Sequence, residues 1–100
     1  MPLYLDELWL NMASPENTKK LNAMFQGLVN GSASFPPGVT LKAGPWMSNE
    51  EPKVILVLDI EDHAKTFVPF TTIVAQGLIA RRRLTPIVEW SAMSEVIKAL

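Results

Sequence analysis

The chain has 100 residues, nearly half of them hydrophobic, and a formal net charge of −1. This length and composition suit one packed domain and exclude a disordered chain. A charge near zero argues against a protein that binds nucleic acid chiefly through phosphates, because such proteins are usually basic. The lack of cysteine excludes disulfides and cysteine-based zinc sites, and it favours a cytoplasmic location. The acidic start of the chain does not resemble a signal peptide, and nothing predicts membrane insertion.

The first third of the chain predicts a strand and then a helix. Residues 3–12 alternate with mostly apolar residues on both faces, which is typical of an interior strand. Ser14 as N-cap, followed by Pro15, predicts a helix start, and Asn30-Gly31 predicts its end. The apolar residues of this helix fall at spacings of three and four and form one stripe: Leu21, Met24, Phe25 and Leu28.

The middle of the chain predicts a hairpin. Residues 39–47 form its first strand, which Pro45 interrupts, and the polar residues 48–52 form the turn. Residues 53–60 read KVILVLDI, with apolar residues on both parities. This pattern is typical of a central strand covered on both faces.

The last third predicts a helix, a strand and a short terminal helix. The helical pattern runs from about residue 61 to Ile79, and Pro69 should kink it or split it in two. Residues 82–90 form the predicted fourth strand, which carries Pro86. Ser91 is the expected cap of the final helix. Four apolar side chains of that helix are expected to pack back on the body: Met93, Val96, Ile97 and Leu100.

The prolines indicate which strands lie at the edges of the sheet. Proline removes a hydrogen-bond donor, so the strands with Pro45 and Pro86 belong at edges or bulges. We therefore predict an α+β domain over residues 1–100 with order β-α-β-β-α-β, an antiparallel sheet of order 4-1-3-2, and both main helices on one face. The other face of strands one and three is also apolar, which predicts a homodimer.

The sequence resembles the dimeric α/β-barrel superfamily of ferredoxin-like domains, and within it a small bacterial family of unknown function. The likeness covers most of the chain from about Leu21 onward. The residues that carry it are Pro37-Gly38-Val39-Thr40-Leu41, Gly44-Pro45-Trp46-Met47-Ser48, Asp59-Ile60-Glu61-Asp62 and Leu84-Thr85-Pro86-Ile87-Val88. The resemblance implies a dimer whose sheets face each other, with a pocket between each sheet and its helices. The superfamily includes cofactor-free monooxygenases, lactone isomerases and haem-handling proteins.

The titratable residues offer few candidates for chemistry. His63 is the only histidine; it could be a proton shuttle or a haem ligand, but beside two acidic residues it is more simply read as a surface or capping residue. No acidic spacing suggests a metal site. Asp6 and Glu7 lie in an interior strand and point to opposite faces. Either could be a general acid or base, or could pair with an arginine of the fourth strand.

The remaining candidates are basic and aromatic. Arg81-Arg82-Arg83 could bind an anion or could simply charge an edge strand; alternation points Arg82 away from its neighbours. Aromatic side chains could line a pocket for a flat apolar molecule or could belong to the core or the dimer interface: Tyr4, Trp9, Trp46 and Trp90.

Two functional hypotheses follow. In the first, a cytoplasmic homodimer binds a small, largely apolar molecule between sheet and helices. Its ligand-binding residues would be Tyr4, Trp9, Trp46 and Arg82, and cofactor-free catalysis would use candidates from Asp6, Glu7 and His63. In the second, the protein is an interaction or regulatory module without a substrate. An open cavity with an inward carboxylate favours the first hypothesis, and a pocket sealed by Met and Phe side chains favours the second.

Overall fold

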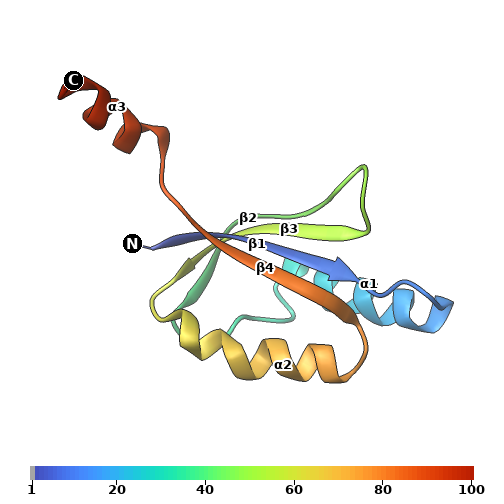
Figure 1. Cartoon of the computed structure of the whole chain (residues 1–100). Coiled ribbons are helices and arrows are strands. Elements are labelled where there is room, and N and C mark those ends of the chain that lie inside the picture. The colour runs from blue at the N-terminus through green and yellow to red at the C-terminus, as the bar shows by residue number, and fades with distance from the viewer. Residues whose placement is uncertain (1) are drawn as a thin grey trace.

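The structure is a computed structural model that describes residues 2–100. Its elements in chain order are β1 (Leu3–Leu10), α1 (Pro15–Asn30), β2 (Val39–Met47), β3 (Lys53–Ile60), the 3-10 helix η1 (His63–Thr66), α2 (Phe67–Ala75), β4 (Ile79–Ile87) and α3 (Trp90–Lys98). The fold is therefore α+β, as predicted (Figure 1). No helix within residues 2–100 combines the length and the apolar character needed to cross a membrane.

The four strands form one sheet of order β2-β3-β1-β4, which is 4-1-3-2 when read from the β4 edge. All three pairings are antiparallel. The two strands that contain a proline, β2 with Pro45 and β4 with Pro86, are the edge strands. The inference from proline to sheet edge is confirmed, because an edge strand leaves one row of backbone N–H groups without a ladder partner.

Helix α1 begins and ends as predicted. The Ser14 hydroxyl accepts a hydrogen bond from the backbone N–H of Asn17 at 3.1 Å, and Pro15 occupies the first turn. Gly31 ends the helix in the left-handed conformation, with φ of 80°. The apolar stripe of α1 faces the sheet, where Leu21 is buried and Met24 and Phe25 pack against the core.

The second helical region differs from its predicted extent. A 3-10 turn precedes α2, and Pro69 lies in the first turn of α2, where a backbone N–H has no partner within the helix. The predicted split is confirmed. The predicted end at Ile79 is wrong, because Gly77 adopts a φ of 75° and Ile79 already belongs to β4. The sequence places Phe67, Phe70, Val74 and Leu78 at spacings of three and four, so the helical pattern continues past the true end of α2.

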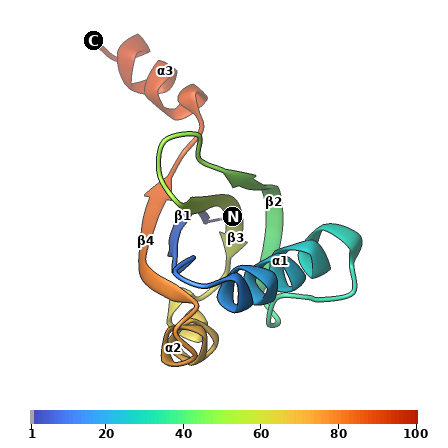
Figure 2. The same ribbon diagram turned by 90° about the vertical axis from the view of Figure 1, so that its right-hand side faces the viewer.

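Helices α1 and α2 lie on the same side of the sheet (Figures 1 and 2). The core lies between these two layers and contains nine buried apolar residues: Leu8, Leu10, Leu21, Val54, Leu56, Leu58, Ile60, Leu78 and Ile79. We call the sheet face toward the helices the inner face and the opposite one the outer face. The outer face is only half-buried at Leu3, Leu5, Ile55 and Val57.

The terminal helix α3 does not pack back on the body. It begins at Trp90 with Glu89 as its N-cap, rather than after Ser91, and it projects away from the sheet (Figures 1 and 2). Its apolar side chains are exposed. The expectation of back-packing is wrong because Val88 and Glu89 continue the extended direction of β4 and carry the helix outward.

Substitution of Gly44 tests how closely edge strand β2 approaches the backbone of β3. Its φ is 90°, and a Cβ atom there would lie 2.6 Å from the backbone oxygen of Ile55. We expect Gly44→Ala to lower the free energy of unfolding by about 2–3 kcal/mol, measured by urea denaturation. Gly31→Ala is the matched control, because Gly31 has a φ of 80° but a methyl group added there would meet nothing within 4 Å; its loss should be about 1 kcal/mol. Equal losses would contradict the close approach at Gly44.

Candidate functional site

Strand alternation divides the charges of β1 between the two sheet faces. Asp6 lies on the inner face with Leu8, whereas Glu7 lies on the outer face with Trp9. The prediction that the two carboxylates point to opposite faces is confirmed. They therefore belong to different environments and cannot act together on one substrate.

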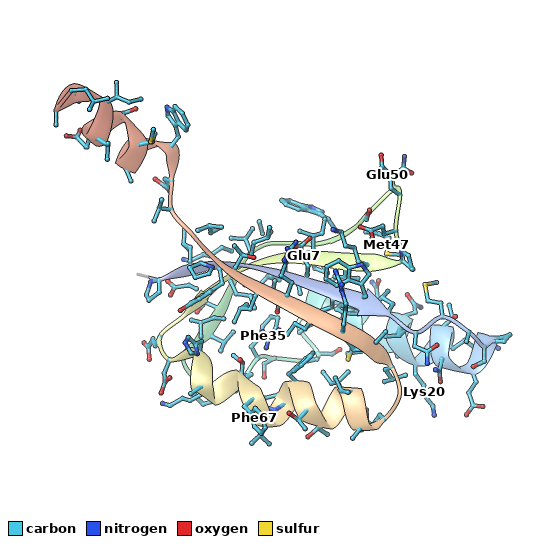
Figure 3. All side chains as sticks on the ribbon, in the orientation of Figure 1. Glu7, Lys20, Phe35, Met47, Glu50 and Phe67 are labelled. Atoms are coloured by element: carbon cyan, nitrogen blue, oxygen red, sulfur yellow. The ribbon has the colours of Figure 1, made fainter. Side chains whose placement is uncertain are left out.

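A cavity of about 210 Å³ lies between the inner face of the sheet and the two helices. Its walls come from all four strands, from η1, α1 and α2, and from the loop between α1 and β2, and they are mainly apolar. Figure 3 shows Phe35 of that loop between the sheet and α2, whereas Phe67 points away from the sheet. The apolar side chains that line the cavity include Leu8, Met24, Phe35, Leu56, Phe70 and Ile73. Asp6, Thr66 and Arg82 supply polar groups to the same cavity.

Asp6 and Arg82 form a bidentate ion pair in this cavity wall. The Arg82 Nε and Nη2 atoms donate to Asp6 Oδ1 and Oδ2 at 2.8 and 2.9 Å. The two side chains are only 5% and 11% exposed, in the order Asp6 and Arg82. The prediction that a carboxylate of the first strand meets an arginine of the fourth is confirmed. A bidentate geometry of this kind is the strong form of the interaction.

Thr66 and Phe70 complete the surroundings of Arg82. Arg82 Nη1 donates to Thr66 Oγ1 at 3.1 Å, and Thr66 Oγ1 donates to the carbonyl oxygen of His63 at 2.7 Å. The guanidinium carbon also lies 5.0 Å from the centre of the Phe70 ring, a cation–π distance. Thr66 was not predicted, because its role depends on the 3-10 turn that places it beneath β4.

The ion pair retains hydrogen-bonding capacity. A guanidinium carries five N–H groups, and Asp6 and Thr66 accept three of them. Two donors of Arg82 and further lone pairs of Asp6 thus remain on side chains that line the cavity. Because the two charges compensate each other, the site suits a neutral ligand group that can accept or donate a hydrogen bond.

The outer face carries a separate cluster around Trp9. Lys53 Nζ lies 2.6 Å from Glu7 Oε2 and 3.3 Å from Glu51 Oε2, and the guanidinium carbon of Arg81 lies 3.8 Å from the Trp9 ring centre. The hydrogen bond with Glu7 raises the pKa of Lys53. Hydrogen bonds from Trp9 and then Lys53 lower the pKa of Glu51. Glu7 and Trp9 therefore belong to a charged network on the outer face of the sheet, remote from the cavity.

The structure separates the other predicted site residues. Tyr4 lies on the inner face, edge-on to His63 with ring centres 6.1 Å apart, and neither residue lines the cavity. His63 is exposed in η1. Trp46 is exposed near the end of edge strand β2. Of the predicted candidates, the structure brings together Asp6 and Arg82 in the cavity wall.

Asp59 is a second unusual carboxylate, on the outer face opposite Leu3. Its residue is only 3% exposed, yet within residues 2–100 neither carboxylate oxygen accepts a hydrogen bond. It adjoins a shallow depression that Lys42 and Ile87 also line. Burial of an unpaired carboxylate is costly, so this part of the outer face is chemically incomplete in the single chain.

Neither a protein-family model, nor a curated protein, nor a solved structure matches the chain. In residues 2–100, no three His, Asp or Glu side chains gather in a way that could hold a metal ion.

The energetic role of the inner ion pair can be tested with two variants. We expect Asp6→Leu to lower the free energy of unfolding by about 3–5 kcal/mol, because it leaves the buried Arg82 without its counter-charge. The double variant Asp6→Leu/Arg82→Met should recover most of that loss or exceed the original stability. Urea denaturation measures both, with Glu16→Gln at the exposed Glu16–Lys20 pair as control. A double variant no more stable than Asp6→Leu would show that the pair itself stabilises the fold.

Proposed function

We propose that the protein is a cytoplasmic homodimer of the dimeric α/β-barrel, ferredoxin-like type, and that each chain binds a small, largely apolar molecule in the cavity between sheet and helices. The observation that carries this proposal is the pairing of an apolar cavity of about 210 Å³ with an inward carboxylate, Asp6, held by Arg82. An inward carboxylate in an apolar cavity supports a binding site over a core that serves folding alone.

Support for the dimer comes from the outer face. Its centre presents the half-buried apolar side chains of Leu5, Ile55 and Val57, and a helix layer covers only the inner face (Figure 2). The unpaired Asp59 lies on the same outer face. A second subunit against this face would remove the apolar surface from water.

The size and charge of the cavity define the ligand class. Engineered apolar cavities of roughly 150 Å³ bind benzene, whereas drug-sized ligands need roughly 300–1,000 Å³. The present cavity therefore suits a single substituted ring or a short chain. A charged ligand would disturb the balance between Asp6 and Arg82, so we infer a neutral molecule with one carbonyl or hydroxyl group.

The same pair suits a cofactor-free isomerisation of a carbonyl compound. Asp6 would accept a proton from the carbon beside the carbonyl, and a free N–H group of Arg82 would donate a hydrogen bond to the developing enolate oxygen. In a β,γ-unsaturated carbonyl compound the enolate extends over the double bond as a dienolate, and return of the proton from Asp6 to its γ carbon would complete the isomerisation and restore the carboxylate. Thr66 would position Arg82 through its hydrogen bond to Nη1.

The alternative is a non-catalytic interaction module whose apolar surfaces serve assembly only. The observation that favours it is the exposed apolar side of α3, which lies outside the cavity. In this case the cavity would be a packing defect that no small molecule occupies.

Fragment binding separates the two functions. We expect 4-methylphenol to bind with a Kd on the order of 1 mM, equivalent to about −4 kcal/mol, and 4-methylbenzoate to bind at least tenfold more weakly because of its charge. Ligand-observed NMR measures both. Ile73→Trp should abolish binding, because Ile73 lines the cavity and a larger side chain there would fill it.

The matched control is Val74→Trp, which changes the neighbouring, exposed residue of α2. It should bind 4-methylphenol as the unmodified chain does. Equal binding by Ile73→Trp, or no binding by the unmodified chain, would refute the ligand site. Native mass spectrometry tests the assembly independently: a dimer supports the proposed homodimer, and a stable monomer refutes it.

A further inference from the structure

Helix α3 presents a continuous apolar stripe to solvent. Trp90, at 73% exposed, and Leu100, at 96%, mark its two ends. The remaining members of the stripe follow at spacings of three, three and one residue: Met93, Val96 and Ile97. The charged side chains Glu95 and Lys98 pair with each other at 3.1 Å, and their positions in the helix place them on the other side. The helix is therefore amphipathic without a partner on its own chain.

Such a helix needs a partner for its own stability. It has nine residues, whereas isolated helices shorter than about 12–15 residues are marginal in water. Its Glu89 N-cap makes no side-chain capping hydrogen bond. The helical conformation of α3 therefore depends on the free energy gained when its apolar stripe packs against another surface.

An apolar groove of matching dimensions lies at the other end of the domain. It has a volume of about 410 Å³ and lies between α1 and the ends of β1, β2 and β3. No charged residue lines it; its residues are Leu10, Met12, Thr18, Leu21, Asn22, Phe25, Gln26, Val29, Pro45, Trp46, Met47 and Val54. From Thr18 to Val29 the α1 wall is about 16 Å long, close to the roughly 14 Å of α3.

The helix cannot occupy this groove on its own chain. The last residue of β4, Ile87, pairs with Leu3, whereas the groove begins at Leu10, about 23 Å away along β1. The groove also lies on the β2 side of the sheet, three strand spacings or about 14 Å from β4. Val88 and Glu89 together span at most about 7 Å. Figure 1 places α3 and the β2–β3 hairpin beyond opposite ends of the sheet.

We propose that α3 is an exchanged arm, which inserts its apolar stripe into the α1–hairpin groove of a second copy of this chain. In a two-fold dimer the exchange is reciprocal, so both arms and both grooves are covered. Six apolar side chains from Val88 to Leu100, at roughly 100 Å² each, give about 600 Å² for one arm and about 1,200 Å² for two arms, before the surface of the grooves is added. This area is in the range of stable interfaces, about 1,200–2,000 Å².

The inference rests on the homodimer of the proposed function and is independent of the ligand cavity. The arm exchange would give the proposed dimer a second contact between its subunits, separate from the contact at the outer face of the sheet. Because the arm leaves from β4 and the groove lies beside β2, the exchange links the two edge strands of different chains.

Cysteine cross-linking tests the exchange in the 100-residue chain, which has no cysteine of its own. Gln26→Cys, in the groove, is co-expressed with Ile97→Cys, in the stripe, and the product is treated with a short bismaleimide. The control replaces Ile97→Cys by Glu95→Cys, which lies at the same height of α3 on its charged side. We expect the covalent heterodimer from the Ile97 pair to exceed that from the Glu95 pair at least fivefold.

Three results would overturn the exchange. Equal yields from the two pairs, or no covalent dimer, would show that the stripe does not enter the groove of a second chain. In a chain that carries both Gln26→Cys and Ile97→Cys, a product cross-linked within one monomer would show that α3 docks on its own body. If native mass spectrometry still reports a dimer in these cases, only the arm exchange fails; a monomer removes the homodimer as well, and the fragment assay tests the cavity separately.

Discussion

The ion pair between Asp6 and Arg82 is the constraint on which the inner layer depends. Two charges lie against a mainly apolar cavity, where they pair with each other, and Arg82 also donates to Thr66 and lies over the ring of Phe70. A slip of β4 by one residue would turn Arg82 and Leu84 to the outer face and bring Arg81 and Arg83 to the inner face. The observed register, in which Asp6 lies opposite Leu84 and Leu8 opposite Arg82, therefore keeps one arginine and the apolar Leu84 on the inner side.

The pair and the core have different roles. The buried apolar residues of β1, β3 and α1 supply the hydrophobic contribution to folding. A buried ion pair, in contrast, adds little net stability over apolar residues of the same volume. Its presence in the wall of a cavity is therefore easier to explain by binding than by folding. The Glu7–Lys53 pair lies on the outer face and has no such relation to a cavity.

Two surfaces of the single chain are incomplete in the same physical sense. The outer face buries Asp59 without a hydrogen-bond donor, and α3 exposes a full apolar stripe. Both features cost free energy in an isolated chain, and contact with another molecule would remove the α3 stripe from water. The cavity is different, because the polar groups in its wall already pair with one another. The proposed assembly and the proposed ligand binding would thus use separate parts of the molecule.

Local patterns in the sequence determined most of the secondary structure. The run from Lys53 to Ile60, the Ser14-Pro15 start of α1 and its Gly31 end, and the edge positions of the proline-bearing strands all follow from short-range rules. Alternation also determined that Asp6 and Glu7 face opposite ways. Tertiary structure decided the contacts between distant segments, which these short-range rules do not predict. Thr66 meets Arg82 only because η1 packs beneath β4, and Tyr4, Trp9 and Trp46 lie apart because contacts between distant segments depend on the packing of layers. The extended backbone at Val88 and Glu89 decided the direction of α3. An amphipathic pattern predicts that a helix packs against a partner, but it does not predict where that partner lies.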